Sequence, residues 1–147
     1  MICPGCRHDN HAAAVACFEC GKPLWTVTRG TILGGRYEVL SVLGQGGMGM
    51  VYKAQDRTLD EPIALKVLRP DVAPTQEMAA RFHSEIKLAR RVRHRNVCGI
   101  HEYGEDGGLR FIAMEFIEGV DLRHVLTRGG APLPEEAFEI SDRKSVV

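Results

Sequence analysis

Apolar and β-forming residues along the chain predict one helix, with strands before and after it in the sequence. Runs of β-forming residues, separated by glycine-rich, proline-rich or acidic turns, predict five strands. These strands are expected at 37–43, 50–54, 62–68, 99–104 and 109–115. Between the third and fourth runs, Phe82, Ile86, Ala89 and Arg93 recur at three- and four-residue steps, which predicts a helix over 75–93. This segment therefore indicates a mixed domain of strands and helix.

The first 25 residues follow a different pattern, dominated by cysteine. Two Cys-x-x-Cys pairs, with ten residues between them, are formed by Cys3, Cys6, Cys17 and Cys20. Two such pairs on tight turns predict a tetrahedral four-thiolate site for Zn²⁺, and a redox motif or disulfide pair is the alternative. So short a segment cannot bury enough apolar surface to fold alone, so metal binding would supply its folding energy. Residues 26–36 are polar and contain glycine, which indicates a linker with at most one β pairing.

Composition and net charge give no indication of a nucleic-acid or membrane partner. The apolar content of 44% and charged content of 26% fit a soluble globular protein, and the formal net charge of zero argues against a nucleic-acid partner. The basic cluster at 90–95 is typical of a solvated helix end. The longest apolar run, 111–117, is far too short to span a membrane, and the N-terminus has no secretory signal. A cytoplasmic location is therefore expected for this segment.

A glycine motif provides the first candidate for chemistry. Gly44, Gly46 and Gly49 have the spacing G-x-G-x-x-G, which dinucleotide-binding folds and kinases share. A dinucleotide-binding turn must open a helix, whereas β-forming residues follow Gly49. A Walker A loop is excluded because no Gly-Lys-Ser/Thr follows. The succession of strand, glycine loop, strand, turn and strand with Lys66 matches the nucleotide site of a protein kinase.

These motifs carry a resemblance to a known family. Residues 37–140 resemble the N-terminal lobe of a bacterial serine/threonine protein kinase of the eukaryotic-like type, and residues 1–25 resemble a zinc ribbon. The resemblance implies an α+β fold with a five-stranded antiparallel sheet, a helix C and the start of the C-lobe. Zinc ribbons bind nucleic acid, bind protein or act as caps, and a protein partner of the ribbon is one of these alternatives.

The resemblance also implies an ATP site. Val51 and Ala64 would form the roof over adenine, and Lys66 would reach the α- and β-phosphates. Met114 would close the back of the pocket, with backbone groups of Glu115 and Ile117 at the adenine edge. The implied nucleotide-binding residues are Leu43, Gly44, Gln45, Gly46, Gly47, Gly49, Val51, Ala64, Lys66, Met114, Glu115, Ile117 and Asp121.

Two of the implied roles have an alternative. Glu85 would be the helix-C glutamate that pairs with the catalytic Lys66, or else a surface glutamate paired with Arg81 one turn earlier. Asp121 would contact the ribose, or would be the N-cap of a short helix at 122–127.

The end of the chain sets the expected activity. The family's catalytic loop and Asp-Phe-Gly motif would lie beyond Ile140, so a truncated kinase domain at 37–141 is expected, with most Mg²⁺ ligands missing and no activity alone. One back-translation of residues 142–147 matches a DNA-sequencing adapter, which predicts a non-native tail. The expected parent enzyme, which a downstream segment could anchor to a membrane, transfers phosphoryl groups from ATP to protein serine or threonine hydroxyls. The alternative is a non-catalytic regulator that binds nucleotide or a partner.

Overall fold

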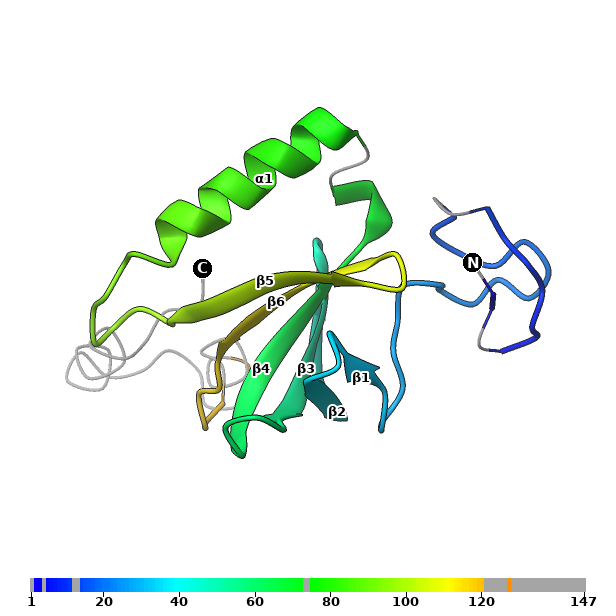
Figure 1. The fold of residues 1–147 in the computed structure, drawn as a ribbon. Helices are drawn as coiled ribbons and strands as arrows, with labels where there is room; N and C mark the ends of the chain where they lie inside the picture. The colour runs from blue at the N-terminus through cyan, green and yellow to red at the C-terminus, as the bar shows by residue number, and fades with distance from the viewer. Residues whose placement is uncertain (1, 4, 12–13, 73–74, 121–126, 128–147) are drawn as a thin grey trace.

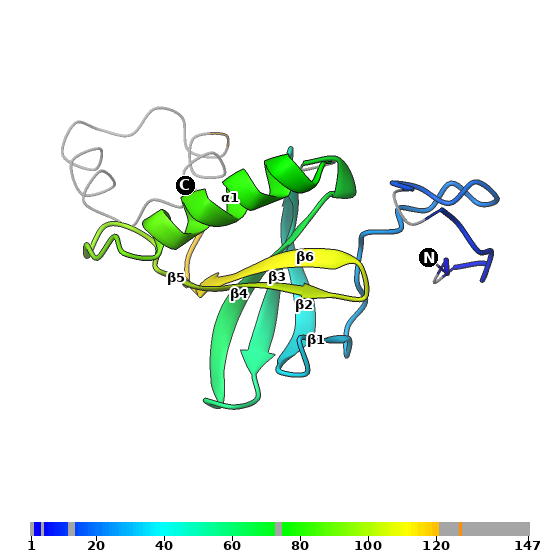
Figure 2. The same ribbon diagram turned by 45° about the horizontal axis from the view of Figure 1, so that its top comes forward.

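The computed structural model describes residues 2–3, 5–11, 14–72, 75–120 and 127. Its elements run in the order β1 (Ile32–Leu33), β2 (Tyr37–Gly46), β3 (Gly49–Asp56), β4 (Glu61–Leu68), a short 3-10 helix η1 (Pro70–Val72), α1 (Gln76–Ala89), β5 (Ile100–Asp106) and β6 (Leu109–Glu115). The strands form one antiparallel sheet in the order β1-β2-β3-β4-β6-β5. Helix α1 runs along one side of this sheet, beside β5 (Figures 1 and 2).

The sheet confirms the five predicted strands and adds a sixth. The extra strand, β1, lies within the predicted linker and pairs with the start of β2. Gly34 and Gly35 make the turn between them, and both have a positive φ that disfavours other residues. The expected five-stranded sheet is therefore corrected to six strands, because two consecutive glycines fold the linker back onto the sheet edge.

Helix α1 begins as predicted and ends earlier. The Thr75 hydroxyl is the N-cap and accepts a hydrogen bond from the Met78 N–H at 3.2 Å. After Ala89 the N–H groups of Arg91 and Val92 bond to carbonyls only three residues back, so the last predicted turn is not α-helical. The helix is therefore 14 residues long and stops before the basic cluster.

The core has two parts on opposite faces of the sheet. The inside of the curled sheet holds one cluster, and the face under α1 holds the other. The first cluster consists of Leu33, Tyr37, Val39, Tyr52, Ala54, Ile63, Leu65, Val67, Phe111 and Ala113. The second consists of Ala64, Leu68, Ile86, Ile112 and Met114. Ile86 is the only buried residue of α1, so the helix packs on the sheet through a narrow contact.

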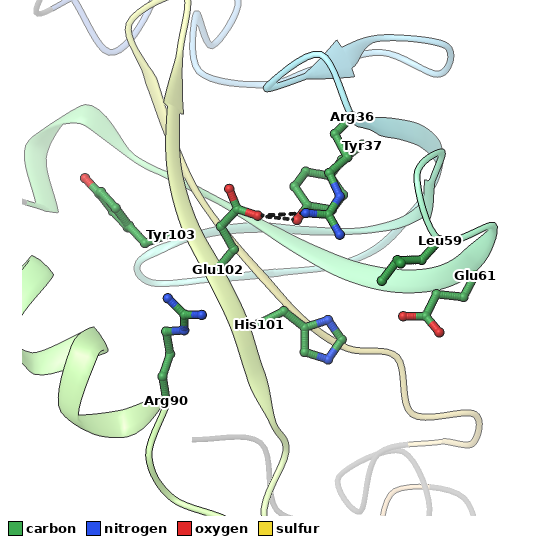
Figure 3. A pocket seen from close by; sticks show the side chains of 8 residues that line it. All are labelled: Arg36, Tyr37, Leu59, Glu61, Arg90, His101, Glu102 and Tyr103. Atoms are coloured by element: carbon green, nitrogen blue, oxygen red, sulfur yellow. Dashed lines mark hydrogen bonds and ion pairs between the residues drawn. The ribbon is translucent and has the colours of Figure 1, made fainter.

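Polar contacts join the two ends of the curled sheet. The Gly34 N–H donates to Asp106 at 2.8 Å, and the Tyr37 hydroxyl donates to Glu102 at 2.6 Å. Arg36 lies between Glu102, at 3.3 Å, and Asp56, at 2.6 Å. Because the β1–β2 end of the sheet and β5 lie at opposite ends of the strand order, these bonds hold the sheet in its curled shape. Next to them is an open pocket of about 580 Å³ (Figure 3).

The pocket in Figure 3 has mixed charge and lies apart from the predicted nucleotide residues. Its walls come from the start of β2, the β3–β4 turn, the end of α1 and β5. The residues are Arg36, Tyr37, Leu59, Glu61, Arg90, His101, Glu102 and Tyr103. None of the predicted ATP-site residues lines it. In the part of the chain that the structure describes, no helix is long and apolar enough to cross a membrane.

Removal of the Asp56 carboxylate should destabilise the lobe. Asp56 is 1% exposed and accepts two bonds from Arg36, one from the Thr58 N–H at 2.9 Å and one from the Leu59 N–H at 3.3 Å. Since Asp56→Ala removes the acceptor of the Arg36 guanidinium and of two N–H groups of the turn, it should lower the unfolding free energy by about 3 kcal/mol. Urea denaturation followed by circular dichroism measures this. The control is Asp71→Ala, which breaks an exposed pair of the same 2.6 Å length and should cost less than about 1 kcal/mol.

The same pair predicts the direction of a pH effect. Hydrogen bonds from Arg36 hold the pKa of the Asp56 carboxyl below its ordinary value. The pair therefore stabilises the fold at neutral pH, and its contribution is lost as pH falls from the ordinary carboxyl pKa through the lowered one. When the pH falls through this range, the unfolding free energy of Asp56→Asn should decrease less than that of the wild type. Equal loss in both proteins would contradict the assignment.

Candidate functional site

The glycine motif forms a tight hairpin rather than a long loop. β2 continues through Gly46, which is paired with Gly49, and the turn is only Gly47 and Met48. A side chain at Gly49 would clash with the Val67 carbonyl of β4, so this position requires glycine for packing. Added Cβ atoms at Gly44, Gly46 and Gly47 would meet nothing within 4 Å. The hairpin backbone is therefore open to a close approach by a ligand, beside the exposed side chains of Leu43 and Gln45.

Strand register brings four predicted site residues onto one face. Val51 on β3 lies opposite Lys66 on β4, and Ala64 on β4 lies opposite Met114 on β6. Because side chains alternate along a strand, Ala64 and Lys66 point to the same face, which is the face that α1 covers. Lys66 is half-buried and has no ion-pair partner among the described residues. A half-buried lysine therefore lies on the same face as an apolar surface.

Glu85 forms the second of its two expected pairings. Its carboxylate lies 3.3 Å from Arg81 Nε, one helical turn away, and its side chain is 62% exposed. Only Ile86 of α1 is buried, and Phe82 meets the Tyr103 ring with centroids 6.4 Å apart. This narrow contact leaves Glu85 in solvent. The pairing of Glu85 with Lys66 stays a prediction, and it would require α1 to lie closer to the sheet.

The segment after β6 is held from two sides. The Glu115 N–H donates to the Gly99 carbonyl at 2.8 Å, and its carboxylate accepts from the Gly99 N–H at 3.2 Å. On the other side, the Lys53 ammonium lies 4.7 Å from the centre of the Phe116 ring. Such cation–π contacts contribute about 0.5–2 kcal/mol. These contacts therefore hold Glu115 and Phe116 beside the strands that carry Val51 and Ala64.

Some contacts were missed from the sequence, and some predictions fall outside the described residues. Lys53 shares the strand face of Val51, so strand alternation could have identified it. No sequence signal pointed to Gly99. Three predictions concern residues outside the described part of the chain. They are the role of Asp121, the short helix expected at 122–127, of which only residue 127 is described, and the tail at 142–147.

The four predicted cysteines come together near the N-terminus. The two turns that carry them are closed by single β-bridges, Ile2 with Asp9 and Ala16 with Pro23. All four sulfur atoms lie within 4.8 Å of one another. A tetrahedral zinc ion with Zn–S bonds of about 2.3 Å places its sulfurs about 3.8 Å apart. The thiol cluster therefore fits one tetrahedral metal ion.

The thiols of the cluster differ in proton affinity. Burial raises the pKa of the Cys17 thiol, but hydrogen bonds from the backbone of Cys20 and Glu19 outweigh it and hold the pKa at about 6. Although the His8 backbone lowers it, burial and the neighbouring thiols raise the pKa of Cys6 to about 12. A metal ion would therefore displace protons from part of the cluster when it binds.

Comparison with known proteins is consistent with this geometry. The family model of the protein kinase domain matches residues 37–143. The chain is 39% identical over 114 residues to the serine/threonine-protein kinase PrkC of Bacillus subtilis, covering 78% of this chain and 18% of PrkC. It is 42% identical over 95 residues to the serine/threonine-protein kinase pkn3 of Myxococcus xanthus, covering 63% of this chain and 17% of pkn3. The chain thus spans less than a fifth of these relatives.

A solved structure shows the same arrangement of strands and helix. The crystal structure of the Mycobacterium tuberculosis PknI kinase domain matches with a TM-score of 0.66 and 35% identity. The match covers 78% of this chain and 46% of that one. The family match, the relatives and this structural likeness agree. The chain belongs to the protein kinase family, and it is homologous to bacterial serine/threonine kinases.

Proposed function

We propose that this chain is the ATP-binding part of a protein kinase that phosphorylates serine or threonine hydroxyls of a protein substrate. The observation that carries the proposal is the shared face of Val51, Ala64, Lys66 and Met114, next to an open glycine hairpin. An apolar roof suits an adenine ring, and a fixed ammonium group suits phosphates. Backbone N–H groups of the hairpin would approach the phosphates, because Gly44, Gly46 and Gly47 leave that surface clear.

The remaining residues would orient the nucleotide. The Glu115 carbonyl and the Ile117 N–H would bind the adenine edge, and Asp121 would contact the ribose or cap a helix. A closer position of α1 would bring Glu85 from Arg81 to Lys66 and hold the ammonium group on the phosphates. Mg²⁺ would neutralise charge on the phosphates during transfer. The catalytic roles of Lys66 and Glu85 are those of positioning groups for the phosphates.

We also propose that the cysteine module binds one Zn²⁺ and folds around it as a zinc ribbon. Four sulfurs from two closed turns provide a complete ligand set with no open position, which is typical of structural rather than catalytic zinc. Cys3, Cys17 and Leu24 form the module's buried apolar cluster. This cluster is too small to stabilise a fold without the metal. A protein partner for the module is the alternative to a purely structural role.

Replacement of Lys66 should weaken nucleotide binding. Lys66→Met keeps the apolar stem and removes the charge, so the dissociation constant for ATP should rise on the order of 10- to 100-fold. Isothermal titration of this chain measures binding, and a longer protein that contains it allows phosphotransfer to be assayed. Lys87→Met, an exposed lysine on α1, is the matched control and should leave both unchanged.

Two results would contradict the proposed function. Equal ATP binding by Lys66→Met and Lys87→Met would show that the shared face is not the phosphate site. Binding that depends on Lys66, together with no phosphotransfer by the longer protein, would favour the non-catalytic regulator instead.

Removal of a cluster cysteine should abolish metal binding. Cys17→Ser should reduce zinc from about one ion per chain to a small fraction, since one of four thiolate ligands is lost. Metal analysis by mass spectrometry after dialysis measures the ratio. Cys98→Ser is the matched control because Cys98 lies outside the cluster and should keep the ion. Zinc retained by Cys17→Ser, or absent from the wild type, would refute the site.

A further inference from the structure

The cysteine module contains a buried polar side chain that is not a metal ligand. Asn10 is 5% exposed, and Asp56 is the only other buried polar or charged residue in the described part of the chain. A buried amide is costly unless its hydrogen bonds are satisfied. In a module with so few buried apolar residues, the position of this amide needs a physical reason.

The Asn10 amide bonds to both cysteine turns. Its Nδ2 group donates to the His8 carbonyl of the first turn at 2.8 Å and lies 3.6 Å from Cys17 Sγ of the second. Its Oδ1 atom accepts from the Phe18 N–H of the second turn at 3.0 Å. One side chain therefore links the two turns that carry the four thiols.

These partners fix which way the amide faces. Exchange of oxygen and nitrogen would bring Oδ1 against the His8 carbonyl and the amino group against the Phe18 N–H. Both of those contacts would be repulsive. Donation by Nδ2 toward the Cys17 sulfur is therefore set by the backbone around it.

The donation matters because Cys17 is one of the two buried ligands. Cys3 and Cys17 are 0% and 3% exposed, whereas Cys6 and Cys20 are exposed. Cys3 Sγ accepts from the backbone N–H of Gly5 at 3.3 Å. Cys17 Sγ has a side-chain donor, Asn10, and this donor can be removed by substitution. Four thiolates around one Zn²⁺ carry a net charge of −2, and N–H donors disperse that charge where water does not reach.

We infer that Asn10 is a positioning residue of the metal centre, which joins the two cysteine turns and donates a hydrogen bond to the Cys17 thiolate. The inference rests on the proposed zinc site. Partners of this kind tune metal affinity by about 10- to 100-fold when they are replaced. Asn10 thus adds a side-chain N–H donor to the backbone donors of Cys17, whereas the Cys3 sulfur accepts from the backbone N–H of Gly5.

Zinc affinity tests the inference in the whole 147-residue chain. Asn10→Asp keeps an acceptor for the Phe18 N–H and removes the donor to Cys17, so zinc affinity should fall about 10- to 100-fold. Competition with a chromophoric chelator measures it. Arg7→Gln is the matched control, because it changes the charge of the same module by the same amount at an exposed residue whose side chain has no partner among the residues that the structure describes. Its affinity should stay within about twofold of the wild type, since its side chain is not part of the network.

Cobalt spectra separate donation from a purely structural role. With saturating Co²⁺, both Asn10→Asp and Asn10→Ala should move the sulfur-to-cobalt charge-transfer band to longer wavelength, because a thiolate that has lost one of its N–H donors is a stronger electron donor. Saturation removes the effect of weaker affinity, and the alanine variant removes the effect of added charge. An unchanged band in Asn10→Ala would overturn the inference even if affinity falls.

The outcomes distinguish this inference from the zinc proposal. A wild type that binds no zinc overturns both. A wild type that binds one zinc, with Asn10→Asp no weaker than Arg7→Gln, overturns only the role of Asn10. Weaker zinc binding in both Asn10 variants, together with the shifted cobalt band, supports it.

Discussion

Strand β4 pairs with β3 on one side and β6 on the other, and its register determines where the candidate site lies. Ile63, Leu65 and Val67 alternate along it and are all fully buried inside the curled sheet. Lys66 falls between two of them and therefore points to the opposite face. A shift of one residue would exchange the two faces and would place a lysine in the apolar interior. Burial of the three aliphatic side chains thus holds the ammonium group on the α1 face.

The curled shape of the sheet depends on a second set of contacts, between the start of β2 and the strands β5 and β6. Tyr37 packs edge-to-face against Phe111, with ring centroids 5.9 Å apart, and its hydroxyl donates to Glu102. Phe111 also lies where a side chain at Gly104 would clash, so glycine allows the ring to fill the interior. Since Phe111 is on β6, the same packing fixes the strand that leads to Met114 and Glu115. The interior of the sheet and the predicted adenine edge are therefore coupled through one strand.

Much of this fold was predictable because its signals are local. The five long strands follow from β-forming runs, and Lys66 was identified because it follows a glycine motif and two strands. The pairing of Glu85 was not predictable, since it depends on how far α1 lies from the sheet, and only Ile86 is buried there. Cysteine spacing predicted the thiol cluster, but the role of Asn10 depends on contacts between two turns. Sequence patterns specify which groups are present, whereas the distance between two elements is set by packing.

The segment between the cysteine module and the lobe shows the same distinction. Its polar composition predicted a linker with at most one β pairing, and β1 makes that pairing with β2. The contact that composition did not predict is the hydrogen bond of 3.1 Å from the Val27 N–H to the Tyr52 hydroxyl. Tyr52 is fully buried on β3, three residues after Gly49, so its hydroxyl requires a partner. The backbone of the linker supplies that partner. The linker is therefore part of the sheet. The hydrogen bond from Val27 also connects the segment after the cysteine cluster to β3, the second strand of the glycine hairpin.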